Sequence, residues 1–224
     1  MTRKPMTKKA MIRMINRHLL ALCATPAFVF AGQWEVGALG GFGYAPKLTA
    51  RAPAGSANAG FENGVVVGAF GGNDTYRYWS GEARYLYRFS DLELQSGGAR
   101  ARLGAHTHIL HADFLGHFRP VESRVRPFVA FGGGAKILQG TGVESASQPL
   151  GRVAALTATQ ELLPVADVGV GVKIDLNRQL RLRFEVRDYL SPAPSRVFTP
   201  APGGSIGAVQ NDVIGLVGVS FTFF

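Results

Sequence analysis

The sequence predicts an all-β fold: an eight-stranded antiparallel β-barrel that spans a membrane as an up-and-down meander. Apolar and polar residues alternate with period two in eight blocks of about ten residues, as half-buried strands require. The connections between these blocks are alternately short and long, and helix-like patterns with capping residues are scarce. No segment after residue 31 has the roughly 18 continuous apolar residues of a membrane-spanning helix.

Composition and charge exclude two classes of protein. Only 17% of the 224 residues are charged, while 10% are aromatic, so the chain is not intrinsically disordered. The net charge of +9 is concentrated at the N-terminus, because residues 1–31 hold six of the 24 lysines and arginines and no acid. Residues 32–224 keep 18 basic and 15 acidic side chains, a net charge of +3, which does not indicate a nucleic-acid partner.

Residues 1–31 predict a signal peptide that is cleaved on export. A basic segment precedes an apolar run from Leu19 to Phe30, and the small residue Ala31 follows it. The chain's one cysteine, Cys23, lies inside this run, and the bulky Leu22 before it disfavours a lipidated cysteine. The predicted barrel domain, residues 32–224, therefore has no disulfide and no thiolate ligand.

The first four strands are predicted from residues 33–44, 64–71, 79–89 and 100–118. In the first, tryptophan, valine and aromatic side chains alternate with glycines and Glu35. The second is a short run of valine, glycine and phenylalanine. The third alternates tyrosine and phenylalanine with charged residues, and the fourth alternates leucine and phenylalanine with histidine and aspartate.

The last four strands are predicted from residues 124–138, 163–175, 179–190 and 212–224. In the fifth and sixth, valines alternate with basic residues, glycines or aspartate. The seventh places leucine, phenylalanine and valine opposite three arginines and a glutamate, and the eighth alternates valine and phenylalanine with glycine, serine and threonine.

Four long connections are rich in Gly, Pro, Ala and Ser and are predicted to be mobile loops. Short turns alternate strictly with them, which is typical of a membrane barrel that has turns on one side and loops on the other. The long connections are residues 45–63, 90–99, 139–161 and 191–210.

The charged face of each strand is predicted to line the barrel interior, and the apolar face to contact lipid. Aromatic residues at strand ends would form girdles at the two membrane interfaces, namely Trp34, Tyr44, Phe89, Phe118 and Tyr189. Glycines on the charged face would relieve crowding in a narrow bore, namely Gly37, Gly41, Gly43, Gly169 and Gly171.

Mixed charges on the inner face predict a plugged lumen filled by salt bridges, because opposite signs can pair where water is excluded. The predicted lumen-lining side chains are Glu35, Glu82, Arg84, Arg88, His111, Asp113, Lys136, Asp167, Lys173, Arg181, Arg183, Glu185 and Arg187.

The last six residues, Val-Ser-Phe-Thr-Phe-Phe, resemble the terminal strand of bacterial outer-membrane β-barrels. Residues 81–85 and 167–171 are similar to strands of the OmpA-like eight-stranded barrel domain family. The resemblance implies an outer-membrane location among lipid and lipopolysaccharide, and a monomeric barrel. It also implies recognition by the barrel-assembly machinery through Val217, Val219, Phe221, Phe223 and Phe224.

Candidate chemical motifs are few, and we expect no catalytic, cofactor or metal site. His106 and His108 have a spacing at which two imidazoles could chelate a metal, but no third ligand lies nearby in the sequence. The glycine-rich segment 132–136 lacks the phosphate-loop spacing and lies within a strand. Serine nucleophile candidates without a fixed spacing to histidine and acid are Ser80, Ser90, Ser96 and Ser191.

These patterns predict a structural or surface role for a small outer-membrane barrel. Three alternatives remain open at this point. One is an OmpW-like channel for small apolar molecules, which would need an apolar lumen. The second is a lipid A-modifying barrel enzyme, and the third is a periplasmic β-sandwich.

Overall fold

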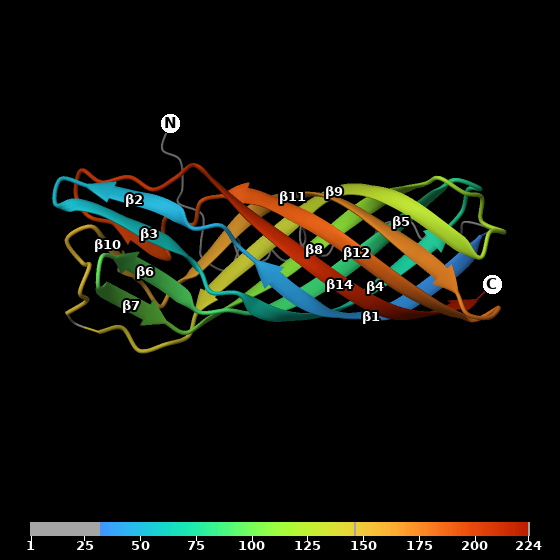
Figure 1. Ribbon diagram of the computed structural model, residues 1–224, viewed down its shortest axis with the longest axis horizontal. Coiled ribbons are helices and arrows are strands. Elements are labelled where there is room, and N and C mark those ends of the chain that lie inside the picture. Colours follow the sequence, from blue (N-terminus) through green and yellow to red (C-terminus); the bar gives the residue numbers. More distant parts are fainter. Residues whose placement is uncertain (1–31, 146, 224) are drawn as a thin grey trace, which may run out of the picture. The chain divides into compact units, whose positions relative to one another are not determined.

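The computed structural model describes residues 32–145 and 147–223, and the predicted leader lies outside them. Eight strands form a closed antiparallel barrel in which β1 pairs with β14, and each other barrel strand pairs with the next along the chain (Figure 1). The predicted eight-stranded meander is therefore confirmed. The barrel strands are β1 (Gln33–Tyr44), β4 (Gly64–Asp74), β5 (Trp79–Phe89), β8 (Ala105–His117), β9 (Val125–Gly140), β11 (Gln160–Asp175), β12 (Leu180–Pro192) and β14 (Val209–Phe223).

No helix among the described residues has the length and hydropathy needed to cross a membrane.

The long connections are not the loops that the sequence predicts. Most of their residues form a cap at one end of the barrel, at the left of Figure 1, which we define as residues 45–63, 90–104, 141–159 and 193–208. One cap sheet has the order β2-β3-β6-β7, and a second pairs β10 with β13. The cap strands are β2 (Leu48–Ala52), β3 (Gly55–Phe61), β6 (Leu92–Ser96), β7 (Ala99–Leu103), β10 (Ala154–Leu156) and β13 (Phe198–Pro200).

A small apolar core explains why the cap is ordered. Alternate alanines and leucines of the four-stranded sheet point to one side, where Leu92 and Leu94 are fully buried. Phe198 of β13 is also fully buried, and its ring packs edge-on against Phe61 at 5.7 Å between centroids. Leu138, at the end of β9, belongs to the same core, so the core continues into the barrel wall.

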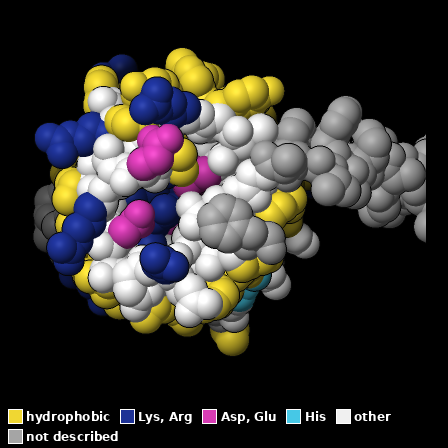
Figure 2. Space-filling view, turned by 90° about the vertical axis from the view of Figure 1, so that its right-hand side faces the viewer, with side chains coloured by type: hydrophobic (Ala, Val, Ile, Leu, Met, Phe, Trp, Pro, Cys, Tyr) yellow, Lys and Arg dark blue, Asp and Glu magenta, His cyan; other side chains and the backbone are white. Residues whose placement is uncertain are grey.

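The barrel has the reverse of a water-soluble distribution of residues. Its largest fully buried side chains include six arginines, whereas its outer surface exposes valines, leucines and aromatic rings. Figure 2 views the end with the short turns: acidic and basic side chains are visible at the centre, and hydrophobic side chains surround them. This arrangement follows from the period of two, since every second side chain of a strand faces the bore.

One aromatic residue faces the opposite way from the prediction. The sequence predicts Tyr189 in the interfacial girdle, but this side chain is completely buried inside the barrel. The reason is the parity of β12, because the inward positions Arg181 to Arg187 continue to residue 189. The four other predicted girdle residues are exposed on the outer face.

Close packing in the bore explains two of the glycines on the inner face. Gly169 lies opposite Arg187 in the β11–β12 register, and a Cβ at this position would lie 2.6 Å from Arg187 Cγ. A Cβ at Gly171 would lie 2.5 Å from Phe128 Cζ and 2.8 Å from Glu185 Cβ. All three distances are too short for a Cβ, so the bore admits no larger residue at these positions without rearrangement.

Gly171→Ala is expected to lower the free energy of unfolding by about 1–3 kcal/mol, the usual effect of overpacking. Gly40→Ala on the outer face is the matched control, because a Cβ there has no atom within 4 Å. Denaturant unfolding of the folded protein in detergent micelles measures both changes. Equal stability of the two variants would contradict the crowded bore.

Candidate functional site

The candidate site is the barrel interior. The structure places all the predicted lumen-lining side chains there, and each residue is at most 6% exposed. Three further charged residues join them that the predicted set omits: Asp74, Arg126 and Asp212. The side chains form three layers along the bore, which we name turn-side, middle and cap-side.

The turn-side layer is built on two carboxylates. Glu35 on β1 accepts hydrogen bonds from Lys173 Nζ at 2.7 Å and from Arg181 Nη1 at 2.9 Å. Asp74, at the end of β4, accepts from Arg126 Nη1 at 2.7 Å and from Arg181 Nη1 at 3.1 Å. Arg181 therefore joins the two acids, and it ties β12 to β1 and β4, neither of which is its neighbour in the barrel.

The middle layer centres on Glu82 and Glu185. Arg183 Nη1 donates to Glu82 Oε2 at 2.7 Å, and Arg183 Nε donates to Glu185 Oε2 at 3.2 Å. Arg84 pairs with both carboxylates, and Arg187 Nε lies 3.2 Å from Glu185 Oε2. Each of these side chains has partners of opposite charge, which is the condition under which buried ions are tolerated.

Two aromatic rings hold the central arginine from its sides. The guanidinium carbon of Arg183 lies 4.7 Å from the centre of the Phe70 ring and 4.9 Å from that of Phe128. Cations are attracted to aromatic faces at such distances, more strongly where water is excluded. The two rings therefore fill space in the bore and at the same time stabilise the buried positive charge through their faces.

His111, Asp113 and Asp167 form a compact group beside the middle layer. Their possible ligand atoms lie within 4.8 Å of one another, which is close enough for a metal ion. However, Arg187 Nη1 already donates to Asp113 at 2.9 Å and to Asp167 at 2.6 Å. The arginine supplies the positive charge that a metal would bring, and His111 Nδ1 completes the group at 2.8 Å from Asp113.

The cap-side layer is separated from the middle layer by apolar side chains. Along β5, the inward residues run Glu82, Arg84, Leu86 and Arg88, and Leu86 belongs to an apolar cluster inside the barrel. Beyond that cluster, Arg88 and Lys136 both pair with Asp212, the former at 2.5 Å. The other members of the cluster are Leu39, Val66, Phe70, Ile109, Val165, Tyr189, Ile214 and Leu216.

Serine, histidine and acid also meet in the bore, but not in a catalytic order. Ser80 Oγ lies 2.9 Å from His117 Nε2, and Asp74 Oδ1 lies 3.9 Å from the same nitrogen. A catalytic triad needs the acid on the other ring nitrogen, where it fixes the tautomer and orientation of the base. Ser80 and His117 are each 6% exposed, so this pair fills the bore.

The outward histidines have neighbours other than metal ligands. His108 Nδ1 lies 2.7 Å from the Tyr85 hydroxyl, and His106 Nε2 lies 3.2 Å from Gln139 Oε1. The two imidazoles meet edge to face, with 5.2 Å between ring centres. In the part of the chain that the structure describes, no group of three potential metal ligands includes either histidine.

Solved structures share this architecture. The chain is similar to the Neisserial surface protein NspA, with a TM-score of 0.53 and 11% identity over 86% of this chain and 98% of that one. The fold is that of the eight-stranded outer-membrane β-barrels.

Two other outer-membrane barrels, both from Pseudomonas aeruginosa and both 14% identical to this chain, match at lower TM-scores. They are the N-terminal β-barrel domain of OprF, with 0.47 over 86% and 98% of the two chains, and OprG, with 0.48 over 86% and 96%. No protein-family model and no curated protein matches the chain.

The predicted assembly signal occupies the closing strand of this outer-membrane barrel fold. Val217, Val219, Phe221 and Phe223 all point to the exposed outer face of β14, and the rings of Phe221 and Phe223 stack at 6.4 Å. Phe224 lies outside the described residues.

Glu185→Gln is expected to lower the free energy of unfolding by about 3–5 kcal/mol, because it leaves buried arginines without their counter-charge. The matched control is Glu122→Gln, which removes a pair with Arg77 whose side chains are 64% and 65% exposed. That change is expected to cost less than about 1 kcal/mol. Denaturant titrations of both variants, followed by tryptophan fluorescence, give the comparison. A Glu185 effect no larger than the control would show that the middle layer is not a stabilising network.

Proposed function

We propose that the protein is an integral outer-membrane β-barrel with a structural or surface role and a lumen sealed by ion pairs. The observation that carries this proposal is the opposite chemistry of the two barrel faces. Arginines, lysines and carboxylates pair inside, and large apolar side chains are exposed outside. Such an outer surface is compatible with lipid and unfavourable in water.

Aromatic residues at both ends of the barrel support a membrane position. Trp34 and Trp79 are exposed near the end with the short turns, and Tyr44 and Phe89 near the cap. Amphipathic rings favour the two levels at which lipid headgroups meet the hydrocarbon. Together with the predicted leader, this favours an exported, monomeric barrel surrounded by lipid and lipopolysaccharide and inserted by the barrel-assembly machinery.

The layers of the lumen favour a sealed barrel over a channel. A conduit for small apolar molecules needs an apolar lumen, but the turn-side and middle layers fill this one with paired charges. A path for ions needs continuous water, and the apolar cluster around Leu86 interrupts the polar layers. The cap core then lies beyond Lys136, whose ammonium group is 5.5 Å from the centre of the Phe61 ring.

A structural or surface role is favoured over catalysis. The Ser80–His117 pair is buried and has its acid on the wrong side of the imidazole for acyl transfer, so a lipid A-modifying enzyme has no support from this geometry. The cap forms an ordered surface at one end of the barrel, and β14 finishes at the other end. Binding functions are commonly carried by such connecting segments on a rigid scaffold.

Purified protein in planar lipid bilayers is expected to give no steady conductance, because paired side chains fill the bore. A variant whose four cap segments are replaced by short turns should also stay closed, since the turn-side and middle layers remain. Heat-modifiable gel mobility verifies folding of each sample, and resistance to carbonate extraction verifies membrane insertion. Steady conductance in the variant would overturn the sealed lumen, and carbonate extraction of the folded protein would overturn the membrane assignment.

A further inference from the structure

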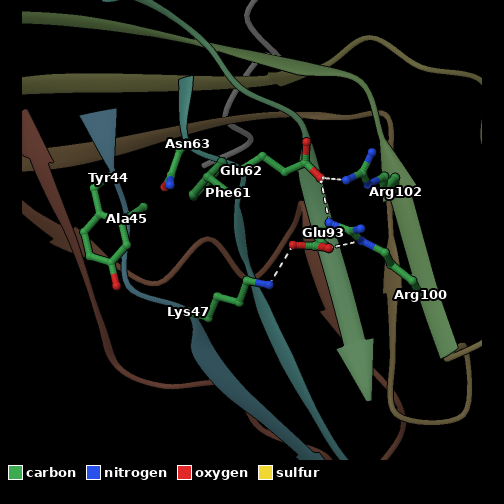
Figure 3. A pocket seen from close by; sticks show the side chains of 9 residues that line it. All are labelled: Tyr44, Ala45, Lys47, Phe61, Glu62, Asn63, Glu93, Arg100 and Arg102. Atoms are coloured by element: carbon green, nitrogen blue, oxygen red, sulfur yellow. Dashed lines mark hydrogen bonds and ion pairs between the residues drawn. The ribbon is translucent and has the colours of Figure 1, made fainter. Parts of the chain in front are cut away.

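A pocket of about 590 Å³ lies where the barrel meets the cap (Figure 3). Its floor and walls come from the end of β1, the cap strands β3, β6 and β7, and the connections that follow β1 and β3. The volume lies within the range of sites for small molecules. The lining residues are Tyr44, Ala45, Lys47, Phe61, Glu62, Asn63, Glu93, Arg100 and Arg102.

Two carboxylates hold three cations around this pocket. Lys47 Nζ lies 2.7 Å from Glu93 Oε2, and Arg100 Nη2 donates to Glu62 Oε1 at 3.1 Å. Arg100 also pairs with Glu93, and Arg102 pairs with Glu62. Figure 3 shows Arg100 and Arg102 of β7 on one side of these acids and Lys47, from the connection before β2, on the other.

Glu93 is buried, whereas Glu62 and the basic side chains remain partly accessible. Glu93 is 2% exposed, whereas the side chains of Arg100 and Arg102 are 47% and 50% exposed. Burial opposes ionisation of Glu93, but hydrogen bonds from Lys47 and Arg100 outweigh it and lower the pKa of this carboxyl below its ordinary value. Glu93 therefore stays ionised in mildly acidic solution and keeps the two basic side chains in place.

The arginines keep donors for a further acceptor. Within the described residues, no hydrogen bond is donated by Arg100 Nη1 or by Arg102 Nε and Nη1. The three cations and two acids leave a net charge of +1 at the pocket. A planar guanidinium binds phosphate through two parallel hydrogen bonds, so adjacent arginines with spare donors suit a phosphate group.

The position of the pocket narrows the class of ligand. Tyr44 lies at the cap end of β1, exposed on the outer face, at the level proposed for the membrane interface. We propose that this pocket binds a phosphate monoester carried by a saccharide. The phosphate contacts Arg100 and Arg102, and the sugar occupies the space beside Tyr44 and Asn63. This ligand chemistry is shared by a phosphorylated lipid headgroup and by a soluble sugar phosphate.

Isothermal titration calorimetry of the full chain in phosphatidylcholine nanodiscs tests the proposal. The two ligands are glucosamine 1-phosphate and unphosphorylated glucosamine. A third titration uses nanodiscs that also contain lipid A as a competitor. Glucosamine 1-phosphate is expected to bind at least tenfold more tightly than glucosamine. The double variant Arg100→Gln/Arg102→Gln should weaken binding at least tenfold. Arg152→Gln, an exposed cap arginine outside the pocket, is the matched control and should leave it unchanged.

The outcomes separate the two sources of ligand. Competition by lipid A would support a lipid headgroup as occupant, and binding of the sugar phosphate without competition would support a soluble ligand. Equal affinity for glucosamine and its phosphate, or equal binding by the double variant and the control, would overturn the proposal. Gel mobility confirms that the variants are folded. The titration does not depend on the state of the lumen, so its result is independent of the conductance test.

Discussion

The ion pairs that Glu82 and Glu185 make with Arg84, Arg183 and Arg187 are the constraint on which the rest of this structure depends. Removing five charges from water is costly unless each has an opposite charge in good geometry. The barrel meets this condition by bringing β5 and β12 to face each other across the bore. Once the charged faces are paired inside, the apolar faces of the same strands must turn outward.

Two further features, barrel closure and the cap, complete the environment of these paired charges. Strands that expose apolar side chains to lipid have no water for their backbone groups, and pairing β1 with β14 leaves no free edge. At the cap end of the barrel, the apolar core of the cap includes Leu138 and Phe61, and the Phe61 ring packs on Arg88 of the cap-side layer. The cap is therefore an ordered layer that holds the surface pocket in a fixed geometry.

Strand parity allowed most of the fold to be predicted. The alternation of Arg181, Arg183, Glu185 and Arg187 with apolar residues gave both the strand and its inner face. The predicted set omits Asp74, which lies beyond the second predicted strand, and Asp212, which opens the eighth predicted strand before its clear alternation. The cap was missed because its strands have only three to seven residues and are rich in alanine, which has weak strand preference. Which acid meets which base depends on register around the whole barrel, which local patterns do not specify.

The central claim is that one face of each barrel strand contacts lipid and the other a sealed, dry interior. Single cysteines at Ala166, Val168, Val170 and Val172, on the outer face of β11, are spin-labelled in phospholipid vesicles to test the lipid contact, since Cys23 lies in the predicted leader. Oxygen should be far more accessible to these four labels than a water-soluble nickel complex. An unlabelled Ser220→Cys is nearly isosteric with the buried serine, and its thiol should not react with a membrane-impermeant maleimide in the folded protein. Nickel accessibility above oxygen accessibility at the outward labels, or rapid reaction of the introduced inward thiol, would contradict the claim.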